Sequence, residues 1–432
     1  MRKIVPIDIP DPQTFKKKLV SWARSCDYFL LLDSNTERYA GTNQDVHFEF
    51  LAAFGMWDYL LTNEEDAFER LDAFFKRHQD WLFGHFSYDL KNGLEKLVSR
   101  HPDEVGFPAL YFFQPKYVVL CKHSKIELQA INTLSDGEIQ ATIHSLQTAS
   151  DNLSGTKNEI RIHQRFERSD YLQTVQRFRD HIKRGDIYEV NFCQEFYSRS
   201  SIDPYVSYQR LNHLSPSPFA AFYKLHDKFL LSSSPERFLK KDGEKVISQP
   251  IKGTIKRGRT PSEDDALKNQ LLHDVKEQAE NVMIVDLVRN DLARTAKKGT
   301  VHVEELFGVY TFEQVHQLIS TVAAEIDSEY MISCIQSAFP MGSMTGAPKV
   351  RAMELIEEYE RTKRGLYSGS VGYFSPDGNF DFNVIIRSIL YNSARKYVSY
   401  SVGGAITYLS EPEKEYEECM VKARAMKQVL NG

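Results

Sequence analysis

The chain has 432 residues, 42% of them hydrophobic and 26% charged, which is typical of a globular protein with ample material for a core. Its 54 basic and 59 acidic residues give a formal net charge of -5, which argues against nucleic acid and anionic membrane as partners. No apolar run reaches the roughly 18 residues of a membrane span, and the N-terminus lacks the apolar segment of a signal peptide. We therefore expect a cytoplasmic protein whose partners are small molecules and other proteins.

The five cysteines are scattered and show no C-x-x-C spacing, so they indicate neither a disulfide framework nor a zinc site. None of them lies in a G-x-C-x-G setting. A cysteine-dependent glutaminase is therefore not expected within this chain.

The first part of the chain reads as mixed α and β. Strand-like runs at 28–32 and 117–120 lie on either side of a helical pattern at 64–77. The polar stretch 149–158 has no apolar periodicity and predicts a loose boundary, which divides the chain into 1–150 and 151–432. After it, Ser169 can cap a helix that runs to about Arg184, and apolar strands are predicted at 186–196 and 228–232.

The sequence Pro250-Ile251-Lys252-Gly253-Thr254 predicts a stiff turn that holds one lysine close to a ligand, because proline fixes a backbone angle and glycine permits close approach. The lysine is then a candidate nucleophile. A solvated basic turn is the alternative, since more basic residues follow directly.

From Pro261 onward, apolar residues at every fourth position predict one long helix capped by Ser262. A second helix closes the chain after a capping-box pattern at 410–413, with a buried stripe at Tyr416, Met420, Ala423, Met426 and Leu430.

Each of these helices carries two glutamates three residues apart, so that the two carboxylates of a pair share a face: Glu277 with Glu280, and Glu415 with Glu418. Such pairs could hold Mg²⁺ if substrate oxygens and water complete the shell, or could simply be solvated acidic faces. Lys422, one turn beyond Glu418, is either an ion-pair partner or a clamp for a ligand carboxylate.

Three further segments favour an anionic ligand. The loop 342–349, with Ser343, is bracketed by glycines and leads into a helix opened by Pro348, where free amides attract anions. Arg387 lies in an apolar run predicted as a strand, where its guanidinium needs a ligand carboxylate or a structural acid. Gly403 and Gly404 let backbone approach a ligand closely, or merely end a strand.

Together these segments resemble the signature blocks of the chorismate-utilising enzymes, strongly from about Ser169 to the C-terminus and thinly before residue 150. The blocks that carry the resemblance are 234–238, 250–254, 279–287, 289–292, 342–354, 372–374 and 415–418.

The resemblance implies an α+β fold of two facing antiparallel β-sheets with helices packed outside, the first part packed intimately on the second. It implies Mg²⁺ bound by Glu280 and Glu418 with support from Glu277 and Glu415. Chorismate would be held by Gly253, Thr254, Ser343, Tyr373, Arg387, Gly403, Gly404 and Lys422. A segment around Ser34 is similar to the place where relatives bind regulatory or structural tryptophan.

Within the family, Lys252 resembles the lysine that marks aminodeoxychorismate synthases, where anthranilate synthases carry alanine. The implied roles are nucleophilic attack by Lys252 at C2 of chorismate, with its pKa lowered by burial or by Lys256 and Arg257, and acid–base work by Glu236. Gln317 stands where anthranilate synthases have histidine, and Glu189 where isochorismate-forming relatives have lysine.

Ala405 and Leu409 also depart from the family pattern, which leaves the detail of the substrate loop open. The resemblance implies a separate glutamine amidotransferase that supplies ammonia, and a product that leads to 4-aminobenzoate and folate. The alternatives are an anthranilate synthase component I and a non-catalytic chorismate-binding subunit.

Overall fold

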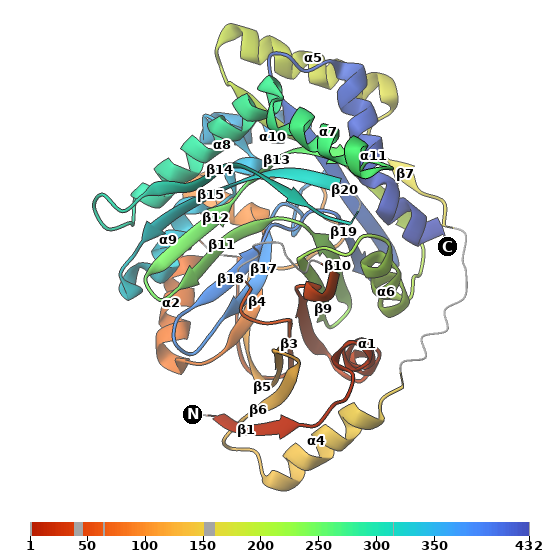
Figure 1. The fold of residues 1–432 in the computed structure, drawn as a ribbon, viewed down its shortest axis with the longest axis vertical. Helices are drawn as coiled ribbons and strands as arrows, with labels where there is room; N and C mark the ends of the chain where they lie inside the picture. Colours follow the sequence, from red (N-terminus) through yellow and green to blue (C-terminus); the bar gives the residue numbers. More distant parts are fainter. Residues whose placement is uncertain (1, 39–45, 64, 151–159, 314, 432) are drawn as a thin grey trace.

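The computed structural model describes residues 2–38, 46–63, 65–150, 160–313 and 315–431. It confirms the α+β class: within this part of the chain, antiparallel pairings link the strands into one hydrogen-bonded network, and helices lie around it (Figure 1). The strands are β1 Arg2–Ile7, β2 Tyr28–Asp33, β3 Phe50–Thr62, β4 Leu82–Phe86, β5 Leu110–Lys122, β6 Lys125–Ile131, β7 His163–Gln164, β8 Glu189–Arg199, β9 Phe219–Leu225, β10 Lys228–Ser234, β11 Arg237–Asp242, β12 Lys245–Gln249, β13 Ile251–Lys256, β14 His302–Thr311, β15 Val315–Glu325, β16 Gly346–Ala347, β17 Ser370–Phe374, β18 Phe380–Asn383, β19 Ser388–Asn392 and β20 Tyr397–Ile406.

The α-helices are α1 Pro12–Trp22, α2 Ala67–His78, α3 Lys91–Glu95, α4 Asp136–Thr148, α5 Arg168–Arg184, α6 Pro204–Leu214, α7 Pro261–Leu272, α8 Val275–Ala293, α9 Met331–Ala338, α10 Lys349–Tyr359 and α11 Pro412–Asn431. Five of the helices, α1, α4, α6, α7 and α8, begin at Asp, Ser or Thr caps, as their sequences favour. None of the helices in the described ranges is both long and apolar enough to cross a membrane.

Successive residues of the strands belong alternately to two apolar clusters. Phe29 and Leu31 belong to the cluster that packs beneath α1, α4, α5, α6 and α11. Leu30, between them, belongs to the other cluster, which includes the buried faces of α2, α8 and α9. This period of two is the pattern expected of strands that are covered on both faces.

The two parts of the chain are interleaved. Strand β2 pairs with β3 on one side and with β9 on the other, and β4 pairs with both β5 and β17. Strands from the early and the late part of the chain therefore lie side by side in the same sheet network. Residues 151–158 of the predicted boundary lie outside the described residues.

Two helix predictions need correction. The long helix predicted from Pro261 is two helices, because the chain breaks at 273–274 and Asp274 caps α8 by accepting hydrogen bonds from the backbone N–H groups of Lys276 and Glu277. Thr260, not Ser262, caps α7. Helix α5 begins at Arg168 with Glu167 at its N-cap position, two residues before the predicted cap Ser169. The carboxylate of Asp274 starts a new helix, so the apolar repeat at every fourth residue does not continue as one helix.

The sequence predicted that Lys252 lies in a turn, but it lies in strand β13. Strand β13 pairs with β15, and its register shifts between Ile251 and Thr254. Gly253 adopts φ +86° at this bulge, a conformation that glycine reaches without strain. The proline–glycine pair therefore distorts a strand and does not form a loop.

Arg387 lies between two strands, not within one. The predicted strand over 380–391 is divided into β18 and β19, and Arg387 adopts φ +49° in the gap. Its carbonyl oxygen accepts a hydrogen bond from the backbone N–H of Ser233. The apolar run predicted a continuous strand because it contains no glycine or proline to mark the break.

Candidate active site

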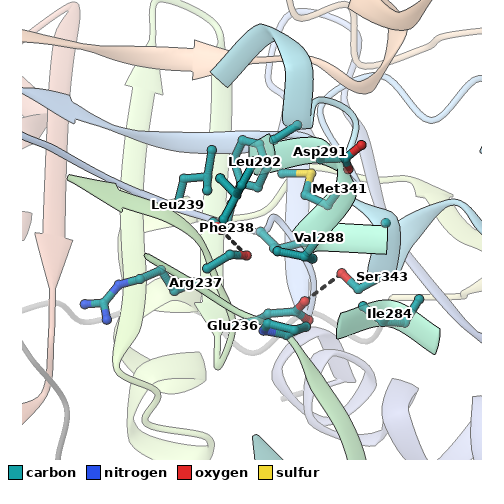
Figure 2. Close-up of a pocket in the computed structure, with 15 residues that line it drawn as sticks. Glu236, Arg237, Phe238, Leu239, Ile284, Val288, Asp291, Leu292, Met341 and Ser343 are labelled. Carbon is teal, nitrogen blue, oxygen red and sulfur yellow. Dashed lines mark hydrogen bonds between the residues drawn. The ribbon is translucent and has the colours of Figure 1, made fainter. Parts of the chain in front are cut away.

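A cavity between β11, α8 and the loop before α10 contains Glu236 (Figure 2). Glu236 precedes β11, is 5% exposed, and accepts a 2.6 Å hydrogen bond from the hydroxyl of Ser343. Ile284, Val288 and Leu292 of α8 form an apolar wall of the same cavity. A buried carboxyl group in such a cavity is well suited to proton transfer.

Burial raises the pKa of Glu236 to about 7, although the hydrogen bond from Ser343 and the positive charge of Lys252 oppose the rise. The group is therefore close to half protonated at neutral pH and can both give and accept a proton.

Lys252 forms a buried ion pair. Its Nζ donates a 2.5 Å hydrogen bond to Oε1 of Glu189, at the start of β8, and both side chains are almost fully covered. Burial by itself would lower the pKa of Lys252, but attraction to Glu189 and Glu280 outweighs burial and raises the pKa.

The expected lowering of the pKa of Lys252 by Lys256 and Arg257 is therefore incorrect. Lys256 is exposed, and Arg257 forms an ion pair with Asp264. Side chains alternate along a strand, so residues beyond the bulge need not face the same way as Lys252. Its charged neighbours are carboxylates, and it must lose its proton to one of them before it can attack a substrate.

The two predicted glutamate pairs come together across α8 and α11. Nζ of Lys276 lies 3.7 Å from Oε1 of Glu280 and 3.7 Å from Oε1 of Glu415. Lys276 thus bridges the two helices at the place where the prediction put a metal ion.

Two of the predicted glycines lie against these acids. A Cβ on Gly253 would lie 3.1 Å from Oε2 of Glu277, and a Cβ on Gly404 would lie 3.4 Å from Oε2 of Glu415. Lys422 donates to the carbonyl oxygen of Gly403 at 2.9 Å. It also forms a 2.8 Å ion pair with Glu418.

Electrostatics separate the four acids. Burial raises the pKa of Glu280 to about 7 and raises the pKa values of Glu277 and Glu415. The charge of Lys422 lowers the pKa of Glu418. Acids whose charged forms are destabilised by burial gain most from a nearby cation.

These residues fit a divalent cation that also binds substrate. Oε1 of Glu280 is buried and has no hydrogen-bond partner within the described residues, although Lys276 lies near it. In those residues, no group of three or more His, Cys, Asp or Glu side chains is close enough to hold a metal ion alone. An ion here would therefore need oxygens from a substrate or water, as Mg²⁺ commonly takes, and Lys276 would have to move aside.

Other predicted contacts lie close to this centre or apart from it. The positive charges of Arg387 and Lys422 act on the carboxyl group of Glu236, so both lie near it. Thr254 is exposed on β13 and pairs across the sheet with Gln317. Tyr373 lines a second cavity together with Ser34.

Sequence reasoning missed two contacts of the site. The sequence marks Glu189 only as a departure from a lysine, yet Glu189 is the direct partner of Lys252. The predicted site does not include Lys276, which is adjacent to Glu277. Its position one turn before Glu280 is the spacing of a helical ion pair and was the available signal.

Replacing Glu236 with glutamine is expected to change how stability depends on pH. Because the pKa is about 7 in the folded protein and near 4.5 when unfolded, the folded state holds the proton longer, and this group lowers stability as pH rises from about 4.5 to 7. Glutamine does not titrate, so the variant should lack that part of the decline. The free energy of unfolding of the variant minus that of wild type should therefore be about 2–3 kcal/mol larger at pH 8 than at pH 4.5. Urea unfolding at both pH values measures the difference, and equal pH dependence in the two proteins would contradict the assignment.

A sequence profile of the chorismate binding enzyme family matches residues 27–428. Anthranilate synthase component 1 of Thermus thermophilus is 37% identical over 83% of this chain and 80% of its own length. Aminodeoxychorismate synthase component 1 of Bacillus subtilis is 32% identical over 86% of this chain and 84% of its own. A probable chloroplastic aminodeoxychorismate synthase of rice is 36% identical over 80% of this chain, which spans only 43% of that longer relative.

The fold agrees with these matches. The crystal structure of anthranilate synthase component I from Streptococcus pneumoniae superposes with a TM-score of 0.78 at 24% identity, over 91% of this chain and 96% of that one. The family profile extends over nearly the whole chain and includes Glu236, Lys252 and all four paired glutamates. The chain belongs to the family of chorismate binding enzymes.

Proposed function

We propose that the chain is the chorismate-aminating component of an aminodeoxychorismate synthase, which converts chorismate and ammonia to 4-amino-4-deoxychorismate and water. The observation that carries the proposal is the buried Lys252, held beside two carboxyl groups that can exchange protons with it and with a substrate. Relatives that bear this name, including the Bacillus subtilis component 1, support it.

The residues present can carry a balanced reaction. Lys252 passes a proton to Glu189, and its neutral amine forms a bond to ring C2 while both ring double bonds shift by one position and the C4–O bond breaks. Glu236 gives its proton to the departing hydroxyl, which leaves as water. Ammonia then bonds to C4 as the C2–N bond breaks, Glu236 takes a proton from the new ammonium, and Lys252 recovers its own from Glu189.

Glu280 and Glu418 would hold Mg²⁺, with Glu277 and Glu415 in support. When bound, the ion would supply positive charge for a substrate carboxylate and for the charge that develops on the ring. Lys422, Arg387 and the backbone near Gly404 would fix the remaining anionic oxygens of chorismate. A partner glutamine amidotransferase would supply the ammonia, and the product would serve 4-aminobenzoate and folate synthesis in the cytoplasm.

Identification of the product decides the function. The purified chain with chorismate, Mg²⁺ and an ammonium salt should form 4-amino-4-deoxychorismate by mass spectrometry, and 4-aminobenzoate only after the matching lyase is added. The Thermus relative makes anthranilate synthase component I the second candidate. Fluorescent anthranilate together with released pyruvate would establish that candidate and overturn ours.

A further inference from the structure

One oxygen of Glu189 is left without a partner by the contacts described above. The side chain is 1% exposed, and its Oε1 accepts the hydrogen bond from Lys252. Its Oε2 is buried and has no hydrogen-bond partner in the described part of the chain. A buried carboxylate oxygen without a donor is unfavourable, so its presence calls for a ligand that can donate.

The backbone of Glu189 is tied to another part of the site. Gly346 and Ala347 of β16 pair with Val190 and Glu189 of β8, so the main chain of Glu189 is fixed by the loop that also carries Ser343. That loop reaches Glu236 through the hydroxyl of Ser343. A single short segment therefore sets the positions of both carboxyl groups around Lys252.

We propose that Glu189 forms the ammonia subsite of this centre, with Oε1 holding the proton of Lys252 and Oε2 accepting an N–H bond from ammonia. The inference rests on the proposed function and adds the residue that receives the second substrate. Ammonia suits this oxygen because it offers N–H donors to the carboxyl group and keeps its lone pair for ring C4.

The burial of the pair sets an order of events. While Lys252 is bonded to Glu189 the two side chains cover each other, and Oε2 is inaccessible. Transfer of the lysine nitrogen to C2 moves it away from Glu189 and frees space beside the carboxyl group. Ammonia then enters after chorismate, its nitrogen bonds to C4, and the C2–N bond to lysine breaks.

The test is steady-state kinetics with ammonium chloride at fixed pH, without any glutaminase, on the Glu189→Gln variant. An amide keeps the size of the side chain but cannot offer acceptors to both Lys252 and ammonia. We expect the KM for ammonia to rise about three- to tenfold, the effect of one hydrogen bond, and the KM for chorismate to stay within about twofold. The kcat should fall as well, because Lys252 loses its proton acceptor.

Glu195→Gln is the matched control. Glu195 lies on the same strand, is 6% exposed, and bonds to Arg165 and Tyr397. It loses a buried charge in the same way, and its KM for ammonia should equal that of the wild type.

If Glu189→Gln lowers kcat but leaves the KM for ammonia unchanged, Glu189 acts only as the proton acceptor of Lys252, and the proposed ammonia subsite is wrong. If circular dichroism shows that this variant is unfolded, Glu189→Asp decides by the same measurement, since it keeps the charge but retracts it by one methylene. A wild-type protein that makes no aminated product from ammonium salts would refute the proposed function instead.

Discussion

Replacing Lys252 with alanine is expected to reduce formation of 4-amino-4-deoxychorismate by on the order of 10³-fold or more, because no other amine would be held against ring C2. Chorismate should still bind, since the groups assigned to its carboxylates remain. Removing the lysine also leaves Glu189 buried without its partner, so some loss of stability is expected.

The measurement combines product formation by mass spectrometry with chorismate affinity by calorimetry. Lys256→Ala is the matched control, because Lys256 lies on the same strand and is exposed. Turnover of Lys252→Ala equal to that of wild type would rule out covalent catalysis by this lysine.

Replacing Glu280 with alanine is expected to raise the Mg²⁺ concentration needed for half-maximal activity by about 100-fold or more. Oε1 of Glu280 is buried without a hydrogen-bond partner, so it would gain most from a bound cation. Losing a residue that supports a metal ligand typically lowers metal affinity by about 10–100-fold, and losing the ligand itself should lower it further. Chelation of the wild type should abolish activity, and added Mg²⁺ should restore it.

Calorimetric titration of Mg²⁺ in the presence of chorismate checks this without relying on turnover. The exposed Glu417, on the same helix as Glu415 and Glu418, provides the control Glu417→Gln, whose Mg²⁺ affinity should not change. Equal Mg²⁺ affinity for wild type and Glu280→Ala would remove Glu280 from the metal site.

Local patterns predicted the elements whose causes are local. The terminal helix follows from its apolar stripe, in which Ala423, Met426 and Leu430 are buried as expected. The three-residue spacing of Glu277 and Glu280 correctly indicated a shared helix face. That α8 and α11 meet through Lys276 depends on tertiary packing, which the local spacing does not contain.

The errors have a common physical origin. Pro250 and Gly253 are turn formers, yet pairing with β15 holds this segment as a bulged strand. Arg387 interrupts a β-rich run because the chain must turn between two pairing partners there. Val275 fits the apolar period of a long helix but is 78% exposed, because α8 starts at a new cap and presents Glu280, Ile284 and Val288 as its buried face.

The interleaving of early and late strands also bears on how the chain is made. Strand β4 is bordered on one side by β5, which follows it closely, and on the other by β17, which is synthesised far later. Until residues 370–374 leave the ribosome, one edge of β4 has no native partner, and the same holds for β2 until β9 appears. Pairings so distant in sequence make folding slow, so the final step of folding has to follow synthesis of most of the chain.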